Sequence, residues 1–200
     1  MSIKKGGFVL DFIKQIEQYQ PINEQETADR AAILETIARF PQNILLRDNT
    51  IAHMTSSGFI VNAAFDKTLM IHHNIYQSWG WTGGHADGDA DLLHVALKEA
   101  WEETGITSVK PLTPKLASLD ILPVFSHIKR GKFVNTHLHL SCAYLLIADE
   151  TEALQYKPDE NSGAKWIPLR EVNTYCTETH MLPVYQKLMK KVENFHANNQ

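Results

Sequence analysis

The chain has 200 residues, of which 44% are hydrophobic, and 19 Lys and Arg stand against 23 Asp and Glu, for a net charge of -4. This length supports one sizeable core, so we expect one main domain with an appendage and exclude two large independent domains. The near-balanced charge, without a run of basic residues, argues against duplex DNA or RNA as a partner.

The cysteines and the N-terminal segment predict a cytoplasmic location. Cys142 and Cys176 lie far apart and form no CxxC pair, which fits a reducing compartment. The segment MSIKKGGFVLDFIKQIEQY has lysines before apolar residues, as a signal peptide has, but Asp11, Lys14 and Glu17 interrupt its apolar part. Because no segment is long and apolar enough to span a bilayer, we expect no membrane partner.

The segment before Asn49 is predicted to form two helices. A second helix would follow Asn23, whose side chain would cap it with Glu26 as the reciprocal partner, and it would end near Pro41. In the first helix, apolar residues recur at spacings of three or four, at Phe8, Phe12, Ile16 and Tyr19. We interpret residues 1–48 as a helical extension packed on a main domain of residues 49–200, with a lid or a dimerisation arm as alternatives.

The rest of the chain alternates predicted strands with two helices. The segments HMTSSGFIVNAA, KTLMIHH and AKWIPLREV are short and mostly rich in branched residues, which predicts strands. KLASLDILPVFSHI and KFVNTHLHLSCAYLLIA are joined by the tripeptide 129–131, a length that suits a hairpin. An apolar stripe over residues 185–195 predicts a helix that begins near Pro183. Together these elements predict an α/β or α+β sandwich, with helices on both faces of a mixed sheet.

Residues 89–104 combine apolar and acidic residues at helical spacing. On a helix, Glu99, Glu102 and Glu103 cluster beside an apolar arc. The predicted members of this arc are Leu93, Ala96, Leu97 and Ala100. Three carboxylates at the edge of a core repel one another, and a hard cation such as Mg²⁺ or Mn²⁺ would remove the conflict. A solvated acidic face is the alternative for the EAWEE string taken alone.

The stretch GGHADGDADLLHVALKEAWEETGI, residues 83–106, resembles the Nudix box of the Nudix hydrolases. That box reads Gly, five residues, Glu, seven residues, Arg-Glu, an aliphatic residue, any residue, Glu-Glu, any residue, Gly and an aliphatic residue. Gly84 takes the first position. The later positions are matched by Glu99, Ala100, Glu102, Glu103, Gly105 and Ile106. Many fixed residues at fixed separations make this resemblance specific.

Two positions depart from the box. Ala90 stands where the family has its leading Glu, and Lys98 stands where it has Arg. In the family these positions support the metal ligands, and lysine does not reproduce the bidentate fork of arginine. Asp89 or Asp91 is a candidate replacement for the missing Glu. The departures motivate an alternative function, a non-catalytic nucleotide-binding or regulatory module on a Nudix fold.

The resemblance implies a Nudix-type α/β/α sandwich and a hydrolase that cleaves a phosphoanhydride in a nucleoside diphosphate linked to another group. Its partner would be a small nucleotide derivative, and a homodimer is compatible with the N-terminal helices. Catalysis would use Mg²⁺ or Mn²⁺, held by Glu99, Glu102, Glu103 and the main-chain carbonyl of Gly83.

Some family members draw a further carboxylate, a metal ligand or general base, from a loop before a Trp-bearing strand. PDENSGAKWIPL places Glu160 six residues before Trp166, with Asp159 as the reserve candidate. The resemblance therefore implies catalytic roles for Glu102, Glu103 and Glu160. An ordinary polar loop residue is the alternative for Glu160.

Histidine and tryptophan side chains are candidates for contact with substrate. His137 and His139 alternate on a predicted strand, so they share a face and would be half of a zinc site. No third ligand follows at a characteristic zinc spacing, so we rank zinc last, after ordinary strand residues and cleft-lining groups. We expect His85, His139 and Trp81 to contact substrate, the last by stacking on a base.

Overall fold

The computed structural model describes residues 12–129 and 131–199. Its helices are α1 (Phe12–Gln18), α2 (Glu24–Arg39), α3 (Leu92–Thr104), α4 (Val172–Tyr175) and α5 (Leu182–Ala197), with a 3-10 turn at Leu169–Glu171. Its strands are β1 (Ala52–Val61), β2 (Lys67–His73), β3 (Ser78–Gly80), β4 (Thr82–His85), β5 (Lys110–Pro111), β6 (Ser118–Val124), β7 (His127–Lys129), β8 (Lys132–Val134), β9 (His137–Ile147) and β10 (Asn161–Pro168).

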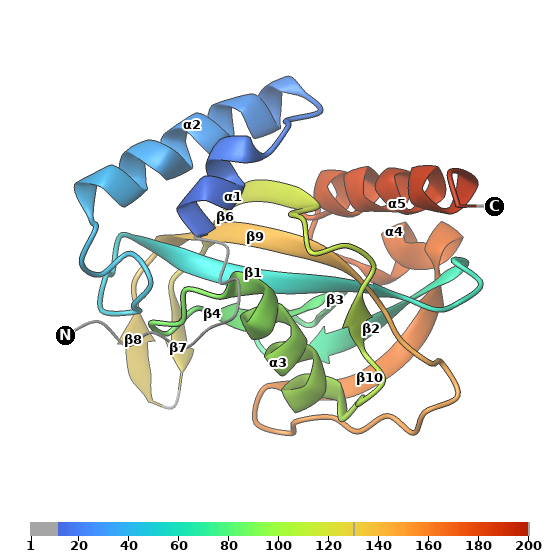
Figure 1. The fold of residues 1–200 in the computed structure, drawn as a ribbon. Coiled ribbons are helices and arrows are strands. Elements are labelled where there is room, and N and C mark those ends of the chain that lie inside the picture. Colours follow the sequence, from blue (N-terminus) through green and yellow to red (C-terminus); the bar gives the residue numbers. More distant parts are fainter. Residues whose placement is uncertain (1–11, 130, 200) are drawn as a thin grey trace.

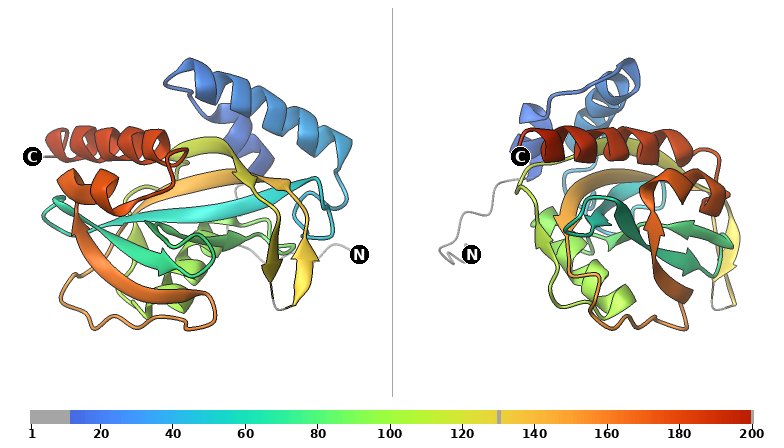
Figure 2. Two further views of the ribbon diagram at one scale, coloured as in Figure 1. Left: turned by 180° about the vertical axis from the view of Figure 1, so that it is seen from behind. Right: turned by 90° about the vertical axis from the view of Figure 1, so that its right-hand side faces the viewer.

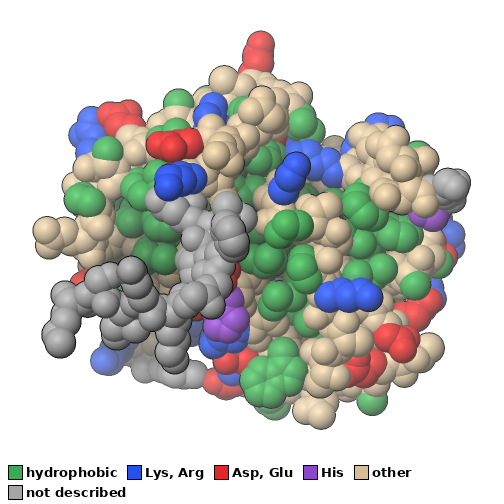
Figure 3. All heavy atoms as spheres, viewed as in Figure 1, with side chains coloured by type: hydrophobic (Ala, Val, Ile, Leu, Met, Phe, Trp, Pro, Cys, Tyr) green, Lys and Arg blue, Asp and Glu red, His purple; other side chains and the backbone are tan. Residues whose placement is uncertain are grey.

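Helices flank a curled mixed sheet on both sides, which confirms the predicted α/β/α arrangement. In Figure 1, α1, α2 and α5 lie above β9, and α3 lies below β1. The views from behind and from the side show the same order of layers (Figure 2). On the face drawn in Figure 3, basic and acidic side chains are interspersed with hydrophobic ones, which fits the small net charge.

β1 is the central strand of the sheet. The main strand order is β10-β2-β1-β9-β5, with β3 beside β2, β4 beside β1 and β6 beside β9. β1 and β9 run parallel, whereas the other pairs are antiparallel. All of β1 is buried because apolar clusters cover both of its faces. Met54 and Ile60 join the cluster with α1, α2 and α3, while Phe59 and Val61 join the cluster with α5.

The predicted hairpin between the two long segments is confirmed. β6 and β9 pair antiparallel, with Leu119 opposite Cys142, and β7 and β8 form its two-stranded tip. Arg130, in the predicted connection, lies outside the described residues. The predicted C-terminal helix is also present, with Pro183 in its first turn. Within the described part of the chain, no helix is long and apolar enough to cross a membrane.

The N-terminal helices form as predicted, with one local difference. Asn23 Oδ1 accepts the N–H of Glu26 at 2.8 Å, which confirms the cap. The predicted reciprocal contact from Glu26 to the N–H of Asn23 is replaced by one to the N–H of Ile22, at 3.0 Å. The other oxygen of the Glu26 carboxylate belongs to a buried ionic network. α1 begins at Phe12, and Phe8 lies outside the described residues.

That buried network joins α2, β6 and α5, and we call it the α2–α5 network. Lys187 Nζ lies 2.8 Å from Glu26 Oε1 and 2.8 Å from Asp120 Oδ1, and the Lys187 side chain is 5% exposed. Tyr19 donates its hydroxyl to Glu26 Oε1 at 2.6 Å. Burial opposes ionisation of Glu26, but the hydrogen bonds from Lys187 and Tyr19 outweigh it and lower the pKa of Glu26 below its ordinary value.

Candidate functional site

A pair of glycines on β4 lies against the carboxylates of α3. β4 pairs antiparallel with β1, so that Gly83 lies opposite Ser57 and Gly84 opposite Ser56. A β-carbon at Gly84 would lie 2.6 Å from Glu99 Oε1, and one at Gly83 would lie 2.9 Å from the carbonyl oxygen of Ser56. A side chain at Gly84 would displace the Glu99 carboxylate, whereas one at Gly83 would press on β1, so glycine at both positions lets β4 lie close to its neighbours.

The buried face of α3 differs in part from the predicted arc. Its buried residues are Leu92, Val95, Ala96, Ala100, Glu103 and Thr104. Leu93 and Leu97, which the prediction placed in the arc, are only partly buried. Helical spacing alone does not say which of two neighbouring apolar arcs faces the sheet. The face that is used here runs from Leu92 to Glu103, so Glu103 continues the core stripe.

The three glutamates therefore lie at different depths. Glu103 is 5% exposed, whereas the side chains of Glu99 and Glu102 are 13% and 29% exposed. Gly83 donates its N–H to Glu103 Oε2 at 3.0 Å, which fixes the buried carboxylate under β4. The cluster thus offers one oxygen ligand group from the core and two from the rim.

Glu103 has an unusual ionisation equilibrium. Burial raises the pKa of Glu103 to about 8, the charges of Glu99 and Glu160 add to the increase, and the hydrogen bond from Gly83 opposes it. A group of oxygen donors whose negative charges disfavour one another fits a hard divalent cation, because the cation would offset that repulsion. The residues present therefore fit Mg²⁺ or Mn²⁺.

Lys98 contacts the two rim glutamates. Its Nζ lies 3.1 Å from Glu99 Oε1 and 3.2 Å from Glu102 Oε1. Lysine supplies one compact positive charge to both carboxylates, whereas an arginine would offer a planar fork of donors. Lys98, which replaces the arginine of the Nudix box, therefore contacts two of the predicted metal ligands.

The aspartates near Ala90 serve the start of α3. Asp91 Oδ1 accepts the N–H of His94 at 3.0 Å and caps the helix, and Asp89 pairs with the His94 ring at 2.8 Å. Ala90 packs against the core. Neither Asp89 nor Asp91 is among the described residues that line the cavity beside the glutamates. Both aspartates are engaged at the start of α3, so the structure gives no support to either one as the replacement for the leading Glu.

A cavity of about 580 Å³ lies beside the carboxylates. Glu160, which immediately precedes β10, reaches this cavity, and its Oε2 pairs with Lys157 Nζ at 3.0 Å. Trp81 lines the cavity and packs edge-on against Tyr185, with ring centroids 5.6 Å apart. Apart from Asp89 and Asp91, the residues predicted for the site line this cavity: Trp81, Gly83, His85, Glu99, Glu102, Glu103, His139, Asp159 and Glu160. Their catalytic and binding roles stay predictions.

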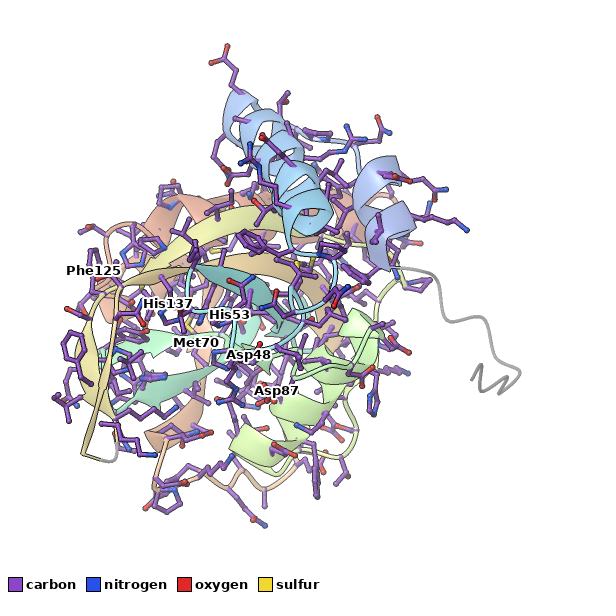
Figure 4. The ribbon with its side chains drawn as sticks, turned by 90° about the vertical axis from the view of Figure 1, so that its left-hand side faces the viewer. Asp48, His53, Met70, Asp87, Phe125 and His137 are labelled. Atoms are coloured by element: carbon purple, nitrogen blue, oxygen red, sulfur yellow. The ribbon has the colours of Figure 1, made fainter. Side chains whose placement is uncertain are left out.

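Four histidines gather in the wall of the same cavity. His53 on β1, His85 on β4, and His137 and His139 on β9 each present a ring nitrogen, and these nitrogens lie within 4.8 Å of one another. Figure 4 shows the side chains of His53 and His137 beside each other. Burial lowers the pKa of His85 to about 3 and that of His139 to about 2.

His53 was not predicted to belong to any site. The parallel register of β1 and β9 places His53 opposite His139, so the two rings share one face of the sheet. A strand register cannot be read from ligand spacing along the chain, because the two residues lie on strands that are distant in sequence. The one sequence feature that pointed to His53 was its position at the start of the predicted strand HMTSSGFIV.

Comparison with known proteins settles the family. The model of the NUDIX domain matches residues 52–188, more than half of the chain. The chain belongs to the Nudix family. No curated protein matches the sequence.

Solved structures of Nudix hydrolases share the fold. The C. elegans Ap4A hydrolase, in a binary complex, is 16% identical, with 70% of this chain and 98% of that chain covered at a TM-score of 0.51. RenU, a Nudix hydrolase from M. smegmatis, is 12% identical, with 71% and 86% covered at a TM-score of 0.52. The E. coli dihydroneopterin triphosphate pyrophosphohydrolase is 15% identical, with 70% and 95% covered at 0.50. By family and by fold, the chain groups with the Nudix hydrolases.

Proposed function

We propose that this Nudix protein is a metal-dependent hydrolase that cleaves a phosphoanhydride in a nucleoside diphosphate linked to another group, by attack of water on phosphorus. The observation that carries the proposal is the position of Glu103. Its carboxylate is buried at the wall of a substrate-sized cavity, beside Glu99 and Glu160, and its pKa is raised. Strongly perturbed carboxylates in a cleft are typical of functional sites.

The carboxylates of α3 would hold the divalent cation. Glu99, Glu102 and Glu103 supply side-chain oxygens, and the main-chain carbonyl of Gly83 is the further ligand that we propose. Bound Mg²⁺ or Mn²⁺ would neutralise charge on the phosphate oxygens and lower the pKa of the attacking water. The N–H of Gly83 orients Glu103, and Lys98 keeps Glu99 and Glu102 close to each other.

Glu160 is our candidate for the general base. It lines the cavity that Glu102 and Glu103 also line, although it comes from a distant part of the chain. Lys157 Nζ lies 3.0 Å from Oε2 of Glu160 and holds this carboxylate at the cavity wall, where a positioned carboxylate can accept a proton from water. We propose that Glu102 and Glu103 complete the catalytic group by orienting the reacting phosphate.

The walls of the cavity suit a nucleotide derivative. Its volume of about 580 Å³ lies within the range of about 300–1,000 Å³ that is usual for small-molecule pockets. Trp81 offers an aromatic face for a base, and Arg47 and Lys129 add positive charge to the lining. His85 and His139 line the same space and are proposed to face the substrate. Two of the structural neighbours are named for Ap4A and for dihydroneopterin triphosphate, so both compounds belong in a substrate panel.

The test is release of phosphate, pyrophosphate or nucleotide from a panel of nucleoside diphosphate sugars, dinucleoside polyphosphates such as Ap4A, nucleoside triphosphates and dihydroneopterin triphosphate, with and without Mg²⁺ or Mn²⁺. We expect metal-dependent release by the unaltered protein and a loss of about 1,000-fold or more in Glu103→Gln. Glu35→Gln is the matched control, because Glu35 is exposed on α2 and pairs with Arg39. Release without metal, or equal release by Glu103→Gln, would exclude the mechanism.

A second candidate function is nucleotide binding without turnover. The observation that favours it is the engagement of Asp89 and Asp91 at the start of α3, which leaves the missing glutamate at position 90 without a substitute from either residue. It predicts stabilisation by nucleotides without hydrolysis, and activity that appears or rises in Ala90→Glu/Lys98→Arg. Clear turnover by the unaltered protein would rule out this alternative.

A further inference from the structure

The four histidines of the cavity wall form a compact group of nitrogens, which we call the histidine cluster: His53, His85, His137 and His139. Five pairs of its rings have centroids between 4.9 and 5.2 Å apart. Three neighbouring strands supply the four side chains, so the backbone positions are fixed by the sheet. Four histidines from distant parts of the sequence gather here either to bind a ligand or to pack against one another.

The ring nitrogens show which kind of ligand fits. His53 Nδ1 lies 2.9 Å from the carbonyl oxygen of Asn49, and His137 Nδ1 lies 2.8 Å from that of Asn135. A carbonyl only accepts, so Nδ1 carries the proton in both rings and Nε2 is left with a lone pair. A backbone carbonyl on one nitrogen is the usual partner that orients a metal-binding histidine.

Two of the ring nitrogens in the cluster lack a partner. Within the described residues, Nε2 of His53 and Nε2 of His139 are buried and have no hydrogen-bond partner, although His53 is only 3% exposed. Buried polar atoms are nearly always satisfied in proteins, so two unsatisfied nitrogens in one cluster indicate a missing ligand. A lone pair at Nε2 of His53 would repel an anion and attract a cation.

We propose that His53, His85, His137 and His139 bind a Zn²⁺ ion. Imidazole nitrogen is a preferred zinc ligand, and four protein ligands make a closed, structural site. A tetrahedral zinc site with Zn–N distances of about 2.0–2.1 Å places its nitrogens about 3.4 Å apart. The nitrogens of the histidine cluster, within 4.8 Å of one another, reach that spacing by small side-chain rotations.

This zinc site is separate from the acidic site. Its donors are nitrogens, whereas the donors of the acidic site are oxygens, and the two sets favour different metals. His85 lies two residues after Gly83 on β4, about 7 Å along the strand. The ion would tie β4 to β1 and β9 and so fix the position of the glycines that face Glu99 and Glu103. His85 and His139 would then act on the substrate only through the shape of the cavity wall.

The test is metal analysis of the purified full chain, followed by removal of metal and titration with Zn²⁺ and with Co²⁺ as a spectroscopic probe. We expect one Zn²⁺ per chain and, for Co²⁺, the strong visible absorption of a tetrahedral nitrogen site. In both His53→Gln and His139→Gln, the affinity for Zn²⁺ should fall by more than about 100-fold, since even loss of an outer partner costs about 10–100-fold. Neither the Co²⁺ absorption nor the Zn²⁺ affinity depends on whether the protein hydrolyses a substrate.

Two controls separate the histidine cluster from other metal sites. His94→Gln removes an exposed histidine on α3, and Glu103→Gln removes a ligand of the acidic site, so both should keep tight zinc binding. Circular dichroism of the metal-free variants shows whether each folds, and a zinc-dependent rise in the unfolding temperature of the unaltered protein tests the site without any substitution. Zinc binding that is absent, that survives both histidine variants, or that is lost in Glu103→Gln would overturn the proposal.

Discussion

The Nudix protein contains two clusters of buried charge that are built in opposite ways. In the α2–α5 network, Glu26 and Asp120 share the ammonium group of Lys187, and Tyr19 adds a hydrogen bond. Lys191 Nζ lies 3.8 Å from Glu26 Oε1 and supplies the second positive charge. At the acidic site, Glu103 is equally well buried, but its charged neighbours include other carboxylates. The first cluster is neutralised within the chain, and the second is left with an excess of negative charge beside an open cavity.

The shifts in pKa express this difference. Hydrogen bonds lower the pKa of Glu26 although burial opposes them, whereas burial and like charges raise the pKa of Glu103 to about 8. A carboxylate with local partners stabilises the fold, while one without them favours a proton or an external cation. In this protein, satisfied buried charge marks a structural role, and unsatisfied buried charge marks the site where a ligand is expected.

The largest expected effect is on turnover when the acidic site is altered. Glu103→Gln should lower hydrolysis about 1,000-fold or more, because it removes a metal ligand. Stability of the metal-free protein at neutral pH should change little, since Glu103 with a pKa of about 8 is mostly protonated there and glutamine has nearly the same shape. Turnover assays with thermal unfolding in a chelator check both statements. If Glu103→Gln lost much stability but kept full activity, the acidic site would have a structural role and not a catalytic one.

The converse is expected for the α2–α5 network. Lys187→Met would leave Asp120 buried without its cation and Glu26 with only the longer contact to Lys191, and breaking such a buried pair costs about 3–5 kcal/mol of unfolding free energy. Activity per folded molecule should stay near that of the unaltered protein. Urea unfolding measures the loss.

Lys190→Met is the matched control for that measurement. Lys190 pairs with Glu193 on the exposed side of α5, where ion pairs contribute about 0–1 kcal/mol. Equal destabilisation by Lys187→Met and Lys190→Met would show that the buried ion pairs stabilise the fold no more than an exposed one.

Substitution of the β4 glycines should separate metal affinity from stability at the acidic site. In Gly84→Ala the new methyl group meets the flexible carboxylate of Glu99, so metal affinity should fall about 10–100-fold with little loss of stability. In Gly83→Ala it meets the carbonyl oxygen of Ser56, a backbone atom that cannot move freely, so unfolding free energy should fall as well. Calorimetric titration with Mn²⁺ and thermal unfolding distinguish the two variants, and identical behaviour would contradict this assignment of contacts.

The pH dependence of stability should follow Glu26. Its pKa is lower in the folded chain than in the unfolded chain, where the ordinary value is 4.5. The stabilising contribution is therefore complete above about pH 4.5 and is lost as pH falls through the lower folded value. Glu26→Gln should unfold with a weaker dependence on pH in that acid range. Unfolding curves between neutral and acid pH measure the slope, and an unchanged slope would count against the network as the acid-sensitive element.

The local features of the fold could be predicted, but contacts between distant segments could not. Asn23 as a cap, Pro183 in the first turn of α5 and the carboxylate spacing on α3 depend on nearby residues, and all three were predicted. The choice of buried arc on α3 depends on the sheet beside it, so helical spacing did not predict that Leu92 and Val95 are buried while Leu93 and Leu97 pack only partly against the core. His53 was missed for a related reason, because its relation to His139 follows from the β1–β9 register.

The smallest effect is expected at Lys98, where the box departs from the family pattern. Its Nζ already contacts Glu99 and Glu102, so Lys98→Arg should raise activity only a few-fold by adding a fork of donors to the same carboxylates. Lys98→Met should lower it by more, because both glutamates lose their cation. If Lys98→Arg instead raises turnover by orders of magnitude, the lysine marks a weakened enzyme. A change of a few-fold identifies the lysine as a working variation of the box, with the positive charge as the property that the site requires.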